Sequence, residues 1–168
     1  MPEVRLERTL RVPADPAYEA LGALLKAIAE QEGMWRGFAL HVGLGDLRLP
    51  DVGYVAVPIR LQVTKKPPKS HSFDIAFNAS RLPAAFPGFN GSMEVVPAAL
   101  GECVLHLRGA YEVPAPFFGK LLDAALTPGV AVRSLENFLE EIGAACEARV
   151  NQREAEFARY RFYATTLQ

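Results

Sequence analysis

The chain has 168 residues, half of them hydrophobic, and its 18 basic and 19 acidic residues give a formal net charge of −1. This length suits one domain with a substantial core. The lack of a net basic charge argues against a nucleic-acid-binding protein, and no uncharged run approaches the roughly 18 apolar residues that span a bilayer. Because the start MPEVRLERTL lacks the apolar stretch of a secretion signal, we expect a cytoplasmic protein without an integral membrane segment.

The first two predicted elements are a strand and a helix. Residues 4–12 alternate between apolar and polar side chains, which predicts a half-buried strand. Arg8 is the one charged residue that shares the parity of the apolar side chains. Residues 13–30 have a helical pattern, with Asp15 predicted as the N-cap and Gly33 just beyond the end.

A series of strands separated by turn signals follows the helix. Each strand is apolar on one face and polar on the other, which indicates an antiparallel meander with one solvated side. Pro58 falls on an outer face and predicts a bulge or an unpaired position, because proline cannot donate to the ladder. A loop marked by proline and glycine is predicted at 83–91. The predicted strands are 38–44, 54–65, 70–80, 92–96 and 102–113.

The C-terminal part is predicted to be a long helix with one buried stripe. Apolar residues recur there at alternating steps of four and three, which forms a narrow seam at 3.6 residues per turn. Pro128 and Gly129 are predicted to kink or interrupt this helix, since proline lacks an amide hydrogen. The seam consists of Leu121, Ala125, Pro128, Val132, Leu135, Leu139, Ile142 and Cys146.

This order of elements resembles the helix-grip fold of the START and pollen-allergen-like superfamily (SRPBCC), which includes lipid-transport proteins and aromatic polyketide cyclases. The likeness is carried by the final strand ECVLHLRGAYEV, the link PAPFFGKLLDAAL and the helical stretch SLENFLEEI. It implies an α+β fold in which a curved antiparallel sheet of six to seven strands wraps around a long C-terminal α-helix, with an apolar cavity between them. Residues 1–148 would form the domain and 149–168 a helix extension or tail.

The candidate ligand site is the inner face of this sheet together with the start of the long helix. These side chains are almost all apolar, and they would serve equally well as the lining of a ligand cavity or as a solid core. The candidates are Arg8, Phe38, Leu40, Val57, Ile59, His71, Phe73, Ile75, Phe77, Met93, Leu107, Tyr111, Leu121, Leu122, Ala125 and Leu126.

The sequence contains no pattern typical of a metal or cofactor site. Its three histidines, His41, His71 and His106, form no close helical pair, and neither Cys-x-x-Cys nor His-Glu-x-x-His occurs. Cys103 and His106 lie three residues apart on a strand and therefore face opposite sides. Cys103 and Cys146 are predicted to be free, buried thiols. We therefore expect no cofactor, no metal and no assembled catalytic group.

These observations lead us to expect binding or transport of a small hydrophobic ligand, such as a lipid, a polyketide-like molecule or an aromatic compound. The alternative is a polyketide cyclase or aromatase in which His71, Arg8 and Tyr111 orient an enolising substrate. Each of the three also has a structural interpretation: a histidine exposed at a strand end, an arginine reaching the sheet edge, and a tyrosine bonded to a backbone carbonyl. A third possibility is an interaction module that works through the basic and aromatic tail. Monomer and homodimer remain equally open.

Overall fold

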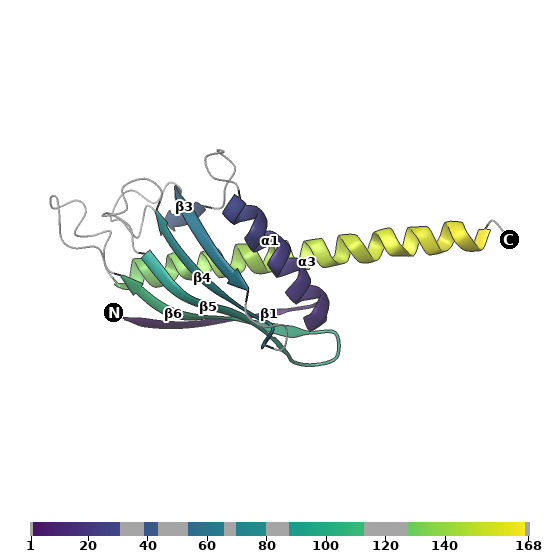
Figure 1. The fold of residues 1–168 in the computed structure, drawn as a ribbon, viewed down its shortest axis with the longest axis horizontal. Helices are drawn as coiled ribbons and strands as arrows, with labels where there is room; N and C mark the ends of the chain where they lie inside the picture. Colours follow the sequence, from purple (N-terminus) through teal and green to yellow (C-terminus); the bar gives the residue numbers. More distant parts are fainter. Residues whose placement is uncertain are drawn as a thin grey trace.

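In the part of the chain that the structure describes, a strand and a helix are followed by five further strands and a long helix (Figure 1). The computed structural model describes residues 2–30, 39–43, 54–65, 70–79, 88–112 and 128–166, and the side chains of 2–30, 59–64, 70–78, 88–112, 129 and 131–158. The elements are β1 (Glu3–Leu10), α1 (Ala14–Glu30), β2 (Ala39–Gly43), β3 (Tyr54–Lys65), β4 (Ser72–Ala79), β5 (Gly88–Pro97), β6 (Cys103–Glu112) and α3 (Pro128–Thr166).

The strands form one antiparallel sheet of six strands in the order β1-β6-β5-β4-β3-β2. Strands β2 to β6 are a meander, and β1 closes it by pairing with the last strand. Pro58 lies opposite Ala39 of β2 and just outside the β3–β4 register, which begins at Ile59. This architecture confirms the predicted α+β helix-grip fold.

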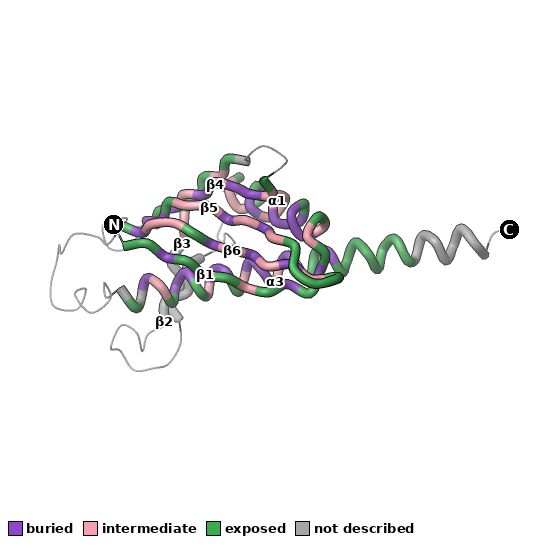
Figure 2. The backbone as a smooth tube through the Cα atoms, turned by 90° about the horizontal axis from the view of Figure 1, so that it is seen from below, coloured by how far each residue is buried: buried purple, intermediate pink, exposed green. Residues whose placement is uncertain are grey.

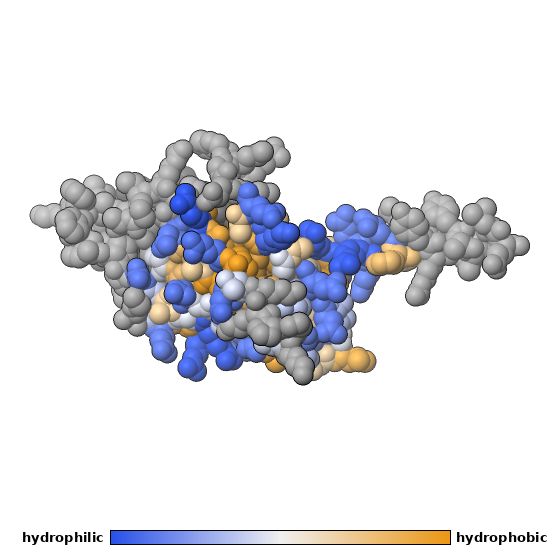
Figure 3. All heavy atoms as spheres, viewed as in Figure 1, coloured by the Kyte–Doolittle hydropathy of each residue, from blue (hydrophilic) through white to orange (hydrophobic). Residues whose placement is uncertain are grey.

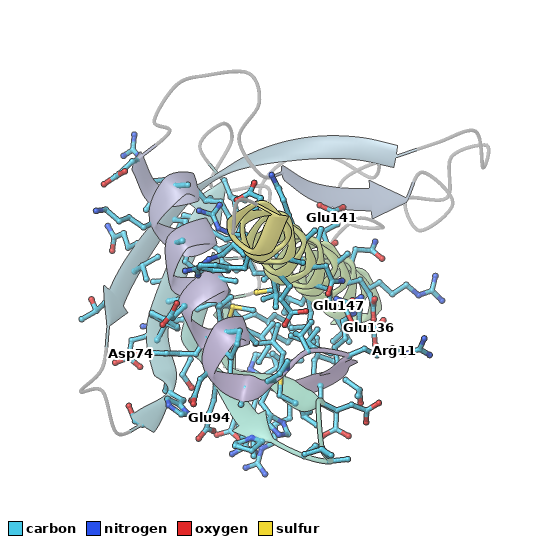
Figure 4. All side chains as sticks on the ribbon, turned by 90° about the vertical axis from the view of Figure 1, so that its right-hand side faces the viewer. Arg11, Asp74, Glu94, Glu136, Glu141 and Glu147 are labelled. Carbon is cyan, nitrogen blue, oxygen red and sulfur yellow. The ribbon has the colours of Figure 1, made fainter. Side chains whose placement is uncertain are left out.

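One face of the sheet is covered by the two helices and the other is open to solvent. Helix α1 packs against β3, β5 and β6, helix α3 packs against β1, β2 and β6, and the helices contact each other. The alternation predicted from the sequence is confirmed, because Phe73, Ile75 and Phe77 of β4 are buried under the helices. In the view along α3, the side chains of Asp74 and Glu94 point away from that helix (Figure 4).

Helix α3 begins at Pro128, so the predicted interruption coincides with the start of the helix. Proline is well suited to the first turn, where its missing amide hydrogen costs no intrahelical bond. The expected link and the helical residues before it, 113–127, lie outside the described residues. The seam is confirmed from Leu135 to Cys146, and it is wider than predicted because Ala131, Phe138 and Val150 are also buried.

Beyond Val150, helix α3 projects away from the domain (Figures 1 and 2). Residues 151–158 are all exposed, and hydrophilic side chains cover the first turns of this projecting part (Figure 3). Arg153 pairs with Glu19 of α1 at its base, with 3.1 Å between Nη1 and Oε2. Within the described residues, no helix is long and apolar enough to cross a membrane.

The predicted bounds of β1 and β4 are wrong by up to two residues, since these strands span Glu3–Leu10 and Ser72–Ala79. The starts of β5 and α1 are also wrong. Strand β5 begins at Gly88, inside the expected 83–91 loop, because residues 88–92 continue the ladder with β6. Helix α1 begins at Ala14, and the amide of Ala17 donates to the carbonyl of Pro13 at 3.1 Å. Asp15 therefore lies in the first helical turn, where its charge favours the positive end of the helix dipole, and is not the N-cap.

Candidate functional site

Arg8 reaches from the edge strand β1 to helix α3. Its Nε lies 2.8 Å from Oε2 of Glu140, and its Nη2 lies 3.1 Å from Oε2 of Glu147. A Cβ atom on Gly143, which lies between these glutamates on the helix, would collide with the guanidinium group. Only glycine allows this close approach, so the four residues, here called the Arg8 cluster, fix α3 to the edge of the sheet.

The Arg8 cluster is extended by the backbone of the chain segment after β1. The amide of Arg11 donates to Oε1 of Glu147 at 2.8 Å, and Figure 4 shows the two residues on the same side of α3. The Nη1 atom of Arg8 is buried and has no hydrogen-bond partner within the part of the chain that the structure describes. Arg8 therefore directs two of its three nitrogen atoms to carboxylates of α3 rather than to a shared centre with the other candidates.

His71 lies at the end of β4, beside the first turns of α1. Its backbone has a positive φ of 43°. The ring centroid lies 5.0 Å from that of Tyr18, and Nε2 lies 3.4 Å from Oδ1 of the exposed Asp15. Its carbonyl accepts a hydrogen bond from the amide of Val95 at 3.0 Å. His71 therefore lies at a strand end, as in the interpretation that gives it a structural role, although it is half-buried rather than exposed.

The structure does not bring Arg8, His71 and Tyr111 together. Arg8 lies opposite Leu105 in the β1–β6 register. Tyr111 lies six residues further along β6, which is about 20 Å at 3.3 Å per residue. His71 precedes β4, which is separated from the edge strand β1 by β6 and β5, and its ring contacts Tyr18 of α1. These three residues therefore provide no common centre for the cyclase alternative.

The two cysteines are fully buried, Cys103 on β6 opposite Leu10 and Cys146 on α3. We call this part of the core the closed end. Burial raises the pKa of the Cys103 thiol to about 11 and that of Cys146 to about 12, with neighbouring negative groups adding to both shifts. Cys146 Sγ lies 3.6 Å from the carbonyl oxygen of Ala17. Both thiols are therefore protonated at neutral pH and poor nucleophiles.

The outward direction predicted for His106 is confirmed. Its Nδ1 lies 3.6 Å from Oε2 of Glu7, which is its cross-strand neighbour on the solvated face. Cys103 is buried on the opposite face, so the two side chains do not form a nucleophile and base. The side chain of His41 lies outside the described residues. Among the described residues, no three His, Cys, Asp or Glu side chains are grouped to hold a metal ion.

Three aromatic side chains form a row across the inner face where α3 begins. Phe77 of β4 lies opposite Phe89 of β5, which lies opposite Tyr111 of β6. The rings of Phe77 and Phe89 are stacked with centroids 5.3 Å apart, and Phe138 of α3 lies 5.3 Å from Phe77 in a tilted arrangement. This part of the core is therefore built mainly from ring contacts.

Two facing glycines form a floor beneath this row. Gly91 and Gly109 are cross-strand partners, so no side chain rises from the sheet at this point. A Cβ atom on Gly91 would collide with the carbonyl oxygen of Arg108, and one on Gly109 with that of Asn90, so the two backbones come closer than any side chain allows. The ring of Phe89 covers the pair, because its Cζ would lie 2.8 or 2.7 Å from those Cβ atoms. The glycine floor is thus covered by Phe89, which is the inward-facing residue two positions before Gly91 on β5.

A small void remains between the aromatic row and the first turns of α3. It measures about 10 Å³, which is the room of a single water molecule. A drug-sized ligand needs a pocket of about 300 Å³ or more. We call this part of the core the aromatic end, and its lining is Phe77, Gly88, Phe89, Tyr111, Ala131, Ser134 and Leu135.

The described candidate residues lie on the inner face as expected. Phe73, Ile75, Phe77, Met93, Leu107 and Tyr111 are buried there, and Ile59 is half-buried. Whether they line a ligand cavity stays a prediction. The candidates outside the described residues are Phe38, Leu121, Leu122, Ala125 and Leu126, together with the side chains of Leu40 and Val57.

Two prominent aromatic residues of this end were absent from the sequence-based candidates. Phe89 fell in a segment whose glycines indicated a loop, although its apolar character and even spacing from Met93 and Val95 were a usable signal. Phe138 lies one position beside the narrow seam, three residues after Leu135, and a wider helical stripe would have included it.

No protein-family model matches the sequence, and no curated protein matches it. Solved structures are similar to it in fold. The protein TTHA0849 from Thermus thermophilus has a TM-score of 0.51 and 18% identity over 88% of this chain and 99% of that one. Ara h 8.0201 has a TM-score of 0.53 and 11% identity over 90% and 98%. A conserved protein from Geobacillus kaustophilus has a TM-score of 0.54 and 12% identity over 90% and 96%. The chain therefore has a helix-grip fold similar to that of these solved structures.

Proposed function

We propose that the protein binds a small hydrophobic ligand at the aromatic end, between the inner face of the sheet and the first turns of α3, and carries or sequesters it. The observation behind this proposal is the floor of Gly91 and Gly109 beneath the ring of Phe89. The two strand backbones approach too closely at this pair for any side chain, so this part of the inner face is covered by the ring of Phe89, a side chain that can rotate away.

Phe89 is the group whose movement would make room. Its ring is held by contacts with Phe77 and by the glycine floor, with a void beside it. Rotation of one side chain leaves the sheet ladder intact, whereas a shift of the strand would break its hydrogen bonds. A ligand that enters over the two glycines would replace the apolar contacts that the ring gives up.

The energetics set the size of ligand that this end would hold. At about 25 cal/mol per Å² of buried apolar surface, micromolar affinity requires at least about 330 Å², because the entropy lost on binding must also be offset. One aromatic side chain buries about 150–250 Å². The ligand would therefore be larger than a single benzene ring, as a fused aromatic compound or a lipid chain is.

Native mass spectrometry of the purified protein tests this proposal. After gentle desalting, we expect a stoichiometric adduct that organic extraction removes and that identifies the ligand class. In Ala131→Leu, the three added carbon atoms exceed the void and would take the space that rotation of Phe89 opens, so the adduct should be lost. Ala144→Leu is the matched control, since Ala144 is exposed on the same helix, and it should keep the adduct. An adduct of equal amount in both variants, or none in the wild-type protein together with no uptake of a hydrophobic probe, would contradict the proposal.

A further inference from the structure

The outer face of the sheet carries two arginines directly opposite each other. Arg5 of the edge strand β1 pairs in register with Arg108 of β6, and both side chains are exposed. Like charges at directly opposed positions repel each other and destabilise a sheet. Neither of the described helices, α1 and α3, covers this face, so packing under them does not explain the placement of the arginines.

The nearby acidic groups form no ion pair with these two arginines. Glu7, two residues along β1, forms its ion pair with His106. On the other side of Arg108, the register partner is the uncharged Ser92 of β5. Among the described residues, no carboxylate forms an ion pair with Arg5 or Arg108. The two positive charges therefore face solvent together.

A groove of about 300 Å³ lies against the two arginines. Ala110 opposes Glu3 in the register, and its short side chain leaves space beside Arg108. Glu3 is the one acidic residue of the lining. The full lining is Glu3, Val4, Arg5, Arg108, Gly109 and Ala110.

We propose that this groove binds the phosphate group of an anionic ligand, with Arg5 and Arg108 as its two ligands. A guanidinium group offers a planar fork of donors that matches phosphate oxygens, and such charge-assisted bonds are stronger than neutral ones. Adjacent strands bring the two forks within reach of one anion, whose charge removes their repulsion. The site lies on the opposite face of the sheet from the aromatic end, so it is independent of the proposed hydrophobic ligand.

Thermal unfolding of the full chain in sodium phosphate and in sodium chloride of equal ionic strength tests the site. We expect phosphate to raise the Tm of the wild-type protein. Arg5→Gln and Arg108→Gln should unfold at the same or a higher temperature in chloride, because the repulsion is gone. In phosphate their Tm should rise less than that of the wild-type protein, and the rise that remains is the general stabilisation by this salt. Losing one arginine should weaken phosphate binding about tenfold or more. This combination of a stable variant and a weaker response separates a binding site from a structural role.

Three further variants sharpen the result. Glu3→Gln removes the acidic residue of the groove and should strengthen phosphate binding. Arg5→Lys keeps the charge but loses the fork, so its response should lie between those of the wild-type protein and Arg5→Gln. Arg149→Gln, an exposed arginine of α3, is the control and should keep the full response. A wild-type Tm that rises no more in phosphate than in chloride, or an equal rise in Arg5→Gln and Arg108→Gln, would overturn the proposal.

Vesicle co-sedimentation distinguishes the two sources of a phosphate group. If the source is a lipid headgroup, the protein should sediment with vesicles of phosphatidylcholine and phosphatidylserine but not with phosphatidylcholine alone, and Arg5→Gln should stay in solution. If the source is a soluble phosphorylated compound, the phosphate response remains and neither vesicle binds the protein. Equal sedimentation of the wild-type protein and Arg5→Gln would overturn the headgroup assignment.

Discussion

The two ends of the core differ in what holds helix α3 to the sheet. At the closed end, Leu10, Cys103, Leu105, Ile142 and Cys146 are fully buried, and the Arg8 cluster adds charged contacts from the edge strand. At the aromatic end, the helix covers stacked rings, two glycines and a small void.

This difference suggests that the two ends of the helix have different roles. Ion pairs and close backbone packing allow few alternative arrangements, because a shift of the helix would leave the Arg8 guanidinium without its carboxylates. Ring contacts are less directional and tolerate a change of rotamer. We therefore expect the closed end to fix α3 in place and the aromatic end to adapt to a ligand.

Truncating one buried side chain at each end should have the largest effects. Phe89→Ala and Ile142→Ala should each lower the free energy of unfolding, by about 3–5 and about 2–5 kcal/mol. Only Phe89→Ala clears the glycine floor, so only this variant should regain stability when a neutral aromatic compound such as naphthalene is added. Chemical denaturation with and without the compound measures this, and equal recovery in both variants would remove the distinction between the ends.

The close approach of Gly143 and Arg8 provides the next largest effect. Gly143→Ala should cost about 1–3 kcal/mol, since the new methyl group displaces the guanidinium. In the background of Arg8→Met, which has a flexible and uncharged side chain, the same substitution should cost less. A double-mutant cycle in urea measures the coupling between the two residues, and additive costs would show that they do not constrain each other.

The thiols of the closed end predict a loss of stability at high pH. An unfolded cysteine ionises at its ordinary pKa of 9.0. In the folded protein, burial raises the pKa of Cys103 to about 11 and that of Cys146 to about 12. Above about pH 9 the unfolded state binds fewer protons, so stability falls with pH until the folded thiols ionise. The slope approaches about 1.4 kcal/mol per pH unit for each thiol.

Replacing Cys146 by alanine isolates this contribution from other groups that titrate in the same range. Urea unfolding between pH 8 and 10.5 should show a shallower decline for Cys146→Ala than for the wild-type protein. The contribution is fully present below pH 9, so the two proteins should run parallel there. Identical slopes above pH 9 would mean that the Cys146 thiol is accessible to solvent.

The smallest effect is expected on the projecting part of α3. Phe157 is 66% exposed, and replacing it by serine should change the free energy of unfolding by less than about 0.5 kcal/mol. Val150, just before the exposed residues, is buried, and Val150→Ser should cost clearly more. A large loss in Phe157→Ser, measured at several protein concentrations, would indicate that this residue is buried in an oligomer.

The sequence was sufficient for the fold because its signals are local. Alternation of apolar residues along β4 and β6 and the seam of α3 follow from the periods of strand and helix, and they identified Phe77 and Tyr111. The start of β5 could not be found in this way, since Gly88 and Gly91 carry the chemistry of a turn. In the sheet, Gly91 instead allows close contact with the ring of Phe89.

The partners of single polar residues could not be predicted. Arg8 shared the parity of a cavity residue, and its carboxylates, Glu140 and Glu147, are more than 130 residues away in the sequence. Neither glutamate belongs to the predicted apolar seam of this helix. Only the placement of α3 across β1 brings these charges together, and that placement depends on the packing of the whole core.

The central claim is that a hydrophobic ligand binds at the aromatic end, and a fluorescence titration with the neutral probe N-phenyl-1-naphthylamine tests it most directly. An uncharged probe avoids the arginines of the outer face. We predict saturable binding to the wild-type protein, unchanged binding to Ala144→Leu and at least about tenfold weaker binding to Ala131→Leu, which corresponds to about 1.4 kcal/mol. Equal binding to all three proteins, or none to the wild-type protein, would contradict the account.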